Sequence, residues 1–403
     1  MLIQLFKTIL LSSLVLMIAV LLVTFPKQAY EASLLGLSMW WEVVFPSLLP
    51  FFITAELLLS FGVVKFFGRL LEPIMRPVFN VPGVGSFAWL MGMASGYPTG
   101  AKISTRLREE KELTQIEAER LVSFTNASSP LFIFGAIAVG FFHDVSLGLL
   151  IAISHYAGNF IVGLCMRFYG RSKEKETFSK SAGKFSWKLA LKDMHQFRIN
   201  DQRPIGMVLG DAIIQSIQTL VMVGGFIILF SVLTEMLHLI QITPFISEVI
   251  GLLFSILSLP LELSLPFISG LFEITIGVNL ISKVNIDSLL QKLIIVSFIL
   301  GFNGFSIQAQ VASILAKTDI RFKPYFFARI LHGLIASILT IFLYQPLYLA
   351  RKQPLPSDVP VIHPADDYIW YEWIIQLKQI GPIFTLISLF VALSILLKRV
   401  SKR

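Results

Sequence analysis

The residues best suited to bind a ligand in this sequence interrupt apolar segments. The stretch SGYPTGAK at residues 95–102 combines a glycine and a proline, which end helices, with three hydroxyl groups and one ammonium group. Thr99 and Gly100 can start a new helix directly after the break, and Lys102 and Arg106 share one face of that helix. The free N–H groups and positive dipole end of such a half-helix suit an anionic ligand. A proline-kinked helix packed against its neighbour is the alternative.

A second interruption follows at SFTNASSPLF, residues 123–132. Asn126, Ser128 and Ser129 precede Pro130, and residues of these types cap a new helix that has proline at its first position. Capping alone explains the pattern, and so does capping combined with ligand binding. Backbone groups released by a break inside a membrane must be buried in protein or face a watery cavity.

A carboxylate occurs within the apolar stretch SGLFEITIG, residues 269–277. A charged side chain at this depth in a membrane is costly and indicates function by default. Glu273 could carry a coupling proton, coordinate Na⁺ or pair with a buried lysine or arginine. A glutamate at the membrane interface is the alternative.

Amides and a hydroxyl interrupt a second apolar stretch, GFNGFSIQAQVASIL, residues 301–315. These polar residues are Asn303, Ser306, Gln308 and Gln310. Amides in an apolar helix indicate a polar cavity, and hydrogen bonding between helices is the alternative.

Motifs of enzymes and metal sites are missing from the sequence. It contains no HExxH, GxSxG or Walker-type loop. His155, His195 and His332 have no partners at metal-ligand spacing, and the single cysteine, Cys165, excludes a disulfide within the chain. We therefore expect neither an enzyme nor a cofactor or metal.

The composition is that of a membrane protein. Hydrophobic residues make up 55% of the 403 residues and charged residues 14%, with a mean hydropathy of +0.76. Soluble domains carry about 25% charged residues, so a polytopic protein in a lipid bilayer is indicated. The net charge of +8 fits basic cytoplasmic loops rather than nucleic-acid binding.

Apolar segments long enough to cross a bilayer occur throughout the chain. The expected spans are 8–25, 45–63, 120–142, 147–168, 218–238, 244–261, 324–347 and 378–397. Residues 64–80 are too charged to span and predict an amphipathic helix in the interface. Together with broken segments, the total is about eight to eleven.

The distribution of lysine and arginine predicts on which side of the membrane each loop lies. Residues 171–203 hold nine lysines and arginines against four acidic residues, which predicts a cytoplasmic loop. Residues 351–373 then fall on the outer side. The predicted parts are an N-terminal transmembrane anchor (1–30), a first gate-like repeat (31–170), a cytoplasmic basic loop (171–204), a second gate-like repeat (205–350), an extracytoplasmic loop (351–373) and a C-terminal transmembrane helix (374–403).

The two halves repeat each other at an offset of 174 residues. Ser95-Gly96 is followed by Ser123-Phe124, and Ser269-Gly270 by Ser297-Phe298 at the same spacing. The order of amphipathic, broken and full segments matches as well. Paired interrupted segments at corresponding positions of two halves point to the binding site of a transporter.

The motifs SGYPTGAK and GFNGFSIQAQVASIL resemble those of the sporulation integral membrane protein family called YlbJ, or SpoVV, of endospore-forming bacteria. The resemblance covers residues 30–350. The family's second motif usually has Gly-Gly where this chain has Asn303-Gly304, and often has histidine at the position of Gln308.

The resemblance implies an all-α polytopic membrane protein. It would have two gate-type repeats with re-entrant and broken helices, similar to concentrative nucleoside transporters. The re-entrant hairpins would be 84–114 and 264–283, and the broken helices 117–142 and 288–315. The stretch 104–120 is more charged than a hairpin arm should be.

The resemblance also implies a function. Such a protein would move dipicolinic acid from the mother cell across the outer forespore membrane, for spore maturation and cortex formation. The expected substrate site comprises Ser95, Gly96, Tyr97, Thr99, Gly100, Lys102, Asn126, Ser128, Ser129, Asn303, Ser306 and Gln308, with Glu273 as the coupling or ion site. The pattern is also compatible with a homo-oligomer. The alternatives are a transporter of nucleosides or another small metabolite, and a sporulation scaffold that does not transport.

Overall fold

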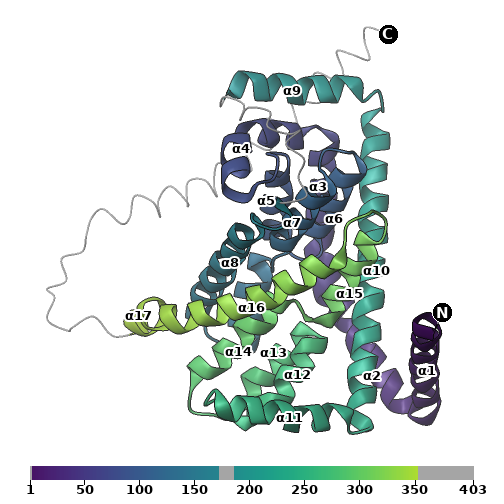
Figure 1. The fold of residues 1–403 in the computed structure, drawn as a ribbon, viewed down its shortest axis with the longest axis vertical. Coiled ribbons are helices and arrows are strands. Elements are labelled where there is room, and N and C mark those ends of the chain that lie inside the picture. The colour runs from purple at the N-terminus through teal and green to yellow at the C-terminus, as the bar shows by residue number, and fades with distance from the viewer. Residues whose placement is uncertain (1, 172–185, 353–403) are drawn as a thin grey trace, which may run out of the picture. The chain divides into compact units, whose positions relative to one another are not determined.

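The computed structural model describes residues 2–171 and 186–352, and residues up to Arg351 form one compact unit (Figure 1). Every regular element in these two ranges is a helix, and no strand occurs there. The expected last span, 378–397, lies outside the described residues, as does nearly all of the loop 351–373. The fold confirms the prediction of an all-α polytopic membrane protein.

The first half begins with helices that bend sharply where glycine or proline occurs. Its elements are α1 (Leu2–Thr24), α2 (Pro26–Ser38), η1 (Met39–Val44), α3 (Phe45–Ser60), α4 (Val63–Phe79), α5 (Gly85–Ser95), α6 (Thr99–Glu109), α7 (Gln115–Thr125), η2 (Leu131–Phe141) and α8 (Ser146–Met166). The chain turns by 103° at Pro26 and by 79° near Gly62, where the φ of the glycine is 76°. Helix α4 confirms a separate helix over residues 64–80.

The second half follows a helix inside the predicted basic loop, α9 (Trp187–Asn200). Its elements are α10 (Ile205–Leu239), α11 (Ile242–Ile256), η5 (Leu261–Leu263), α12 (Ser264–Phe272), α13 (Ile274–Lys283), α14 (Leu289–Phe302), α15 (Gly304–Leu315), α16 (Phe322–Tyr344), η6 (Gln345–Leu349) and α17 (Ala350–Lys352). The long helix α10 packs against α2, α3 and α15 (Figure 1).

Each half contains one interrupted hairpin and one interrupted span. In the first half α5 is separated from α6, and α7 from η2; in the second half α12 is separated from α13, and α14 from α15. Helices α14 and α15 are separated at Asn303 and Gly304. The φ angles of these residues, 76° and 58°, are left-handed and end a helix. The predicted broken helices of the two halves are thus confirmed.

Fewer helices than expected are long enough to cross a membrane. Among the described residues there are 4 such helices, or up to 6 if each bent pair counts as one span. The predicted total of about eight to eleven also includes broken segments and the span 378–397, which lies outside the described residues. The expected span 120–142 is the broken pair α7 and η2, and 244–261 holds the 15-residue helix α11. Apolar composition alone does not distinguish such half-helices from full spans.

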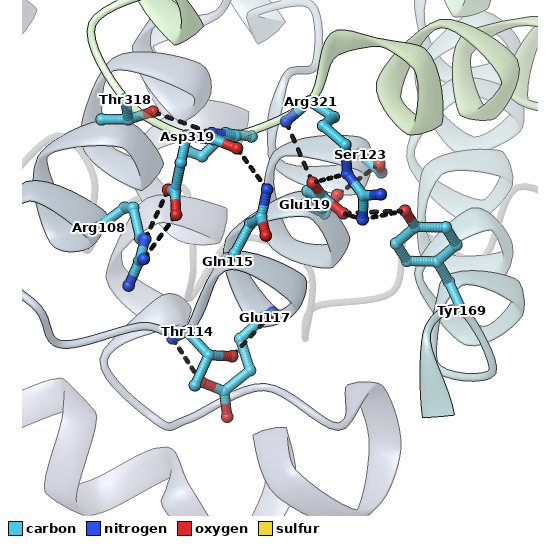
Figure 2. Close-up of polar contacts among 11 residues, drawn as sticks. Arg108, Thr114, Gln115, Glu117, Glu119, Ser123, Tyr169, Thr318, Asp319 and Arg321 are labelled. Atoms are coloured by element: carbon cyan, nitrogen blue, oxygen red, sulfur yellow. Dashed lines mark hydrogen bonds and ion pairs between the residues drawn. The ribbon is translucent and has the colours of Figure 1, made fainter. Parts of the chain in front are cut away.

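An ion-pair cluster of Arg108, Glu119, Tyr169, Asp319 and Arg321 joins distant segments (Figure 2). Arg108 donates to both carboxylate oxygens of Asp319 at 2.8 and 2.7 Å, and a hydrogen bond from this guanidinium lowers the pKa of Asp319. Arg321 donates to both oxygens of Glu119 at 2.7 and 2.9 Å, and the Tyr169 hydroxyl donates to the same carboxylate at 2.9 Å. The cluster fixes the loop between α15 and α16 to α6, α7 and the end of α8.

We expect Arg321→Ala to lower the free energy of unfolding by about 2 kcal/mol, because the buried Glu119 loses its counter-ion. Arg108→Ala is the matched control, since its partner Asp319 is 51% exposed and such surface pairs contribute about 0–1 kcal/mol. Unfolding of the purified protein by SDS in mixed micelles measures both changes. Equal losses in the two variants would contradict the role given to burial.

Candidate functional site

The interrupted helices of both halves meet at a cavity of about 980 Å³. Helix α2 and η1 contribute to one wall, and the two chain breaks of the first half face α13 and α15 of the second. The polar residues that line it are Glu42, Ser95, Tyr97, Ser128, Ser129, Glu273, Thr275, Asn279, Ser306 and Gln310. A mostly apolar cavity of about 300–1,000 Å³ with a few polar groups is typical of a small-molecule site.

The cavity is bordered by the beginnings of three helices. Residues 131–132 of η2, 274–276 of α13 and 306–307 of α15 all line it. The first turn of a helix has N–H groups without partners inside the helix and carries the positive end of the helix dipole. The beginnings of η2 and α15 therefore favour a ligand with negative charge or carbonyl oxygens, whereas the beginning of α13 is capped by the Glu273 carboxylate.

Three serines of the cavity wall have hydroxyls without a hydrogen bond. The Oγ atoms of Ser95, Ser128 and Ser306 are buried and have no partner in the part of the chain that the structure describes. Ser95 is the last residue of α5, before the first break, Ser128 precedes η2, and Ser306 is in the first turn of α15. Buried polar groups are nearly always hydrogen-bonded in folded proteins, so these three hydroxyls are available to a ligand in the cavity.

Glu273 forms the break between α12 and α13. Its backbone is extended, with φ −143° and ψ 122°, and its carboxylate caps α13 by accepting from the amide of Ile276 at 2.9 Å and the hydroxyl of Thr275 at 3.3 Å. The side chain is buried at the cavity wall. No lysine, arginine or histidine of the described residues forms an ion pair with it, so of the three alternatives for Glu273 the pairing with a buried cation is not found there.

Seven of the predicted site residues line the cavity. These are Ser95, Gly96, Tyr97, Ser128, Ser129, Glu273 and Ser306. The Tyr97 hydroxyl donates to the carbonyl of Leu300 at 3.0 Å, so this side chain connects the first break with α14.

Lys102 is not among the residues that line the cavity, contrary to the expected contact with an anion. Its ammonium lies 2.7 Å from one oxygen of Glu56, and Arg106 lies 2.6 Å from the other. The Glu56 side chain is buried on α3, where an unpaired carboxylate would be costly. The two cations on this helix face therefore pair with Glu56, which is 46 residues before Lys102 in the sequence.

Thr99 and Gly100 also lie away from the cavity lining. A Cβ atom built on Gly100 would be 1.9 Å from the carbonyl oxygen of Thr125. The beginning of α6 thus packs directly against the end of α7, and the glycine is required by this contact rather than by a ligand.

The predicted amide residues stabilise the breaks from behind. Asn126 donates to the Tyr325 hydroxyl at 2.8 Å, and the amide of Asn303 lies 3.1 Å from the same hydroxyl. Gln308 donates to the carbonyl of Phe302 at 2.8 Å. These three side chains are buried and are not part of the cavity lining. Gln308 satisfies a backbone carbonyl at the break, and the two asparagines join both breaks to Tyr325.

A buried polar network behind the first half's second break was not predicted. It consists of His155, Asn159, Tyr325, Arg329 and His332, which come from α8 and α16. An arginine in the middle of an apolar span was the available signal. In the described ranges no three histidine, cysteine or acidic side chains are grouped so that they could hold a metal.

Comparison with known proteins supports the two-part architecture. A family model described as "Gate: Nucleoside recognition" matches residues 41–144 and 220–318. Each matched segment contains one interrupted hairpin and one interrupted span.

The similarity to a sporulation protein covers nearly the whole chain. The chain is 52% identical over 387 residues to the sporulation integral membrane protein YlbJ of Bacillus subtilis, with 95% of this chain and 94% of that protein covered. An uncharacterized protein of Alkalihalophilus pseudofirmus is 31% identical over 134 residues, which are 32% of this chain and 27% of that protein. No solved structure matches significantly. The chain therefore belongs to the YlbJ family of sporulation integral membrane proteins, and it contains the gate domain.

Proposed function

We propose that this protein is a transporter that moves dipicolinic acid from the mother cell across the outer forespore membrane, for spore maturation and cortex formation. The predicted division into a membrane anchor, two gate-like repeats, a cytoplasmic basic loop, an outer loop and a last span is part of this proposal.

The observation that carries the proposal is the convergence of three hydroxyls without partners on one cavity. Ser95, Ser128 and Ser306 come from three different breaks in the two halves. Five other buried hydroxyls without partners in the described part of the chain lie outside the cavity lining, those of Ser86, Thr99, Thr105, Ser154 and Thr243. What distinguishes the three serines is that they meet at one cavity. A substrate that binds and leaves explains why these groups are kept without internal partners.

The chemistry of the cavity fits a small planar dianion. Carboxylate oxygens accept hydrogen bonds from serine hydroxyls and from amides at helix beginnings. Tyr97 and Phe132 at the wall offer aromatic faces to a pyridine ring. Glu273 provides a group that could bind a coupling cation or proton.

A nucleoside or another small metabolite is the second candidate substrate, and the match to a nucleoside-recognition model favours it. A nucleoside would use the same hydroxyls but would need no positive potential. A scaffold without transport is the third reading, and it gives the hydroxyls of the cavity no role.

The decisive variant replaces Ser95, Ser128 and Ser306 together by alanine. We expect dipicolinic acid to accumulate in the mother cell and its content in spores to fall about tenfold or more, since each lost hydrogen bond contributes about 1 kcal/mol. Protein stability should change little, because none of these hydroxyls has a close hydrogen bond within the described part of the chain. The readouts are the acid in mother cell and forespore, and uptake into proteoliposomes that contain Tb³⁺, which luminesces with dipicolinate.

Ser216→Ala is the matched control, because its buried hydroxyl donates to the carbonyl of Ala212 on α10, away from the cavity. It should leave transport unchanged. Uptake of uridine but not of dipicolinate by the wild-type protein would favour the nucleoside reading. Normal spores from the triple variant would refute the proposed site.

A further inference from the structure

Arg329 on α16 is completely buried directly behind the cavity. Its guanidinium donates to the carbonyl of Asn126 at 2.9 Å, to the carbonyl of Ser123 and to the side-chain oxygen of Asn159 at 3.2 Å. All three acceptors are neutral. Asn126 is two residues before Ser128 of the cavity wall, so the positive charge lies against the second break.

The two histidines of the network are neutral by their hydrogen bonds. His332 Nε2 lies 2.8 Å from the carbonyl of His155 and must donate to it, which leaves Nδ1 to accept from Arg329 at 3.1 Å. His155 Nε2 accepts from the backbone amide of Ser128 at 2.9 Å. Among the described residues no carboxylate forms an ion pair with Arg329, so this network carries one positive charge and no counter-ion.

The positive charge of Arg329 offsets the negative end of the helix dipole at the second break. The carbonyls of Ser123 and Asn126 belong to the end of α7, which is the negative end of the helix dipole. Without Arg329 that negative end would lie beside the site of an anion. In a low-dielectric interior an uncompensated charge acts strongly on its surroundings, and burying it is costly unless something pairs with it.

We propose that Arg329 determines the charge specificity of the cavity. It neutralises the negative end of α7 and gives the Ser128 side of the site a positive potential, so that a doubly charged anion binds better than a singly charged or neutral analogue. Arg329 acts through the second break and does not line the cavity, so it is a positioning and field-setting residue. The inference rests on the proposed transport of a small dianion.

The experiment compares uptake of dipicolinate, picolinate and pyridine-2,6-dicarboxamide into proteoliposomes. In Arg329→Gln we expect the ratio of kcat/KM for dipicolinate to that for picolinate to fall about tenfold, as expected for loss of one unit charge at close range. Arg329→Lys keeps the charge and should keep most of the ratio. Arg120→Gln is the matched control, because this equally buried arginine also donates to backbone carbonyls, of Asn80 and Tyr169, but not at the cavity.

A second pair of variants decides the matter if Arg329→Gln does not fold. Asn159→Asp leaves the guanidinium in place and supplies a counter-ion, so the ratio should fall as well. Both substitutions remove the amide that donates to the carbonyl of Phe124. Asn159→Ala adds no charge, so its ratio of kcat/KM values should stay that of the wild type.

Each outcome separates the inference from the function on which it rests. The inference is supported if the ratio of kcat/KM for dipicolinate to that for picolinate falls in Arg329→Gln and Asn159→Asp but not in the control variants. If wild-type protein transports dipicolinate but the variants lose all three compounds in parallel, Arg329 has a structural role only and the inference is overturned. If wild-type protein takes up no dipicolinate, the proposed function fails and the inference fails with it.

Discussion

Valine in place of Gly100 is expected to leave no folded protein in the membrane. The first branch point of the new side chain would lie 1.9 Å from the carbonyl oxygen of Thr125 and 2.4 Å from its carbon. Neither atom can move freely, because both belong to the backbone at the end of α7. A Cβ atom built on Gly92 of α5 would lie 1.8 Å from the same oxygen. Both arms of the hairpin therefore pack against the carbonyl of Thr125. Overpacking of this kind costs about 3 kcal/mol or more.

The measurement is the amount of monodisperse protein extracted from membranes, followed by its thermal unfolding. Gly225→Val on α10 is the matched control: it is also a helical glycine, but its Cβ would meet no atom within 4 Å. Both variants replace a helical glycine by valine, so a loss confined to Gly100→Val reports the close packing. A Gly100→Val protein as abundant and stable as Gly225→Val would disprove the contact of α6 with α7.

Glu273→Gln is expected to reduce driven uptake strongly while the protein stays folded. The amide oxygen of glutamine can still cap α13 at the amide of Ile276, but the group can no longer bind a proton or attract a cation. A buried carboxylate without a counter-ion is costly, and its presence therefore indicates a function. We expect uptake to fall about tenfold or more when it is removed. Proteoliposomes with an imposed pH or sodium gradient measure it, and the gradient that no longer stimulates the variant identifies the coupling ion.

Two further variants separate coupling from capping at this position. Glu273→Ala loses the cap as well, so its stability should fall by about 1 kcal/mol, which Glu273→Gln should not show. Glu262→Gln changes an exposed glutamate outside the cavity lining and should behave as wild type. Wild-type gradient dependence in Glu273→Gln would remove this residue from the coupling mechanism.

The breaks in the helices could be read from the sequence because their causes are local. A proline lacks its N–H group wherever the chain goes, and a left-handed φ, as at Gly96 and Asn303, favours glycine or asparagine in any context. The order of breaks in the two halves, the all-α class and the membrane environment follow from such local patterns and from composition. Seven of the residues proposed for the site sit at or beside these breaks and do line the cavity.

Only the tertiary structure decided which polar groups face the cavity and which stabilise its frame. Lys102 is paired with Glu56, 46 residues earlier, and Gly100 is required by the backbone of Thr125. Arg329 reaches the second break from a helix about 200 residues further along the chain. Electrostatic and steric contacts depend on distance in space, which local sequence patterns do not encode, so the charge behind the cavity could not be assigned until α16 was placed against α7.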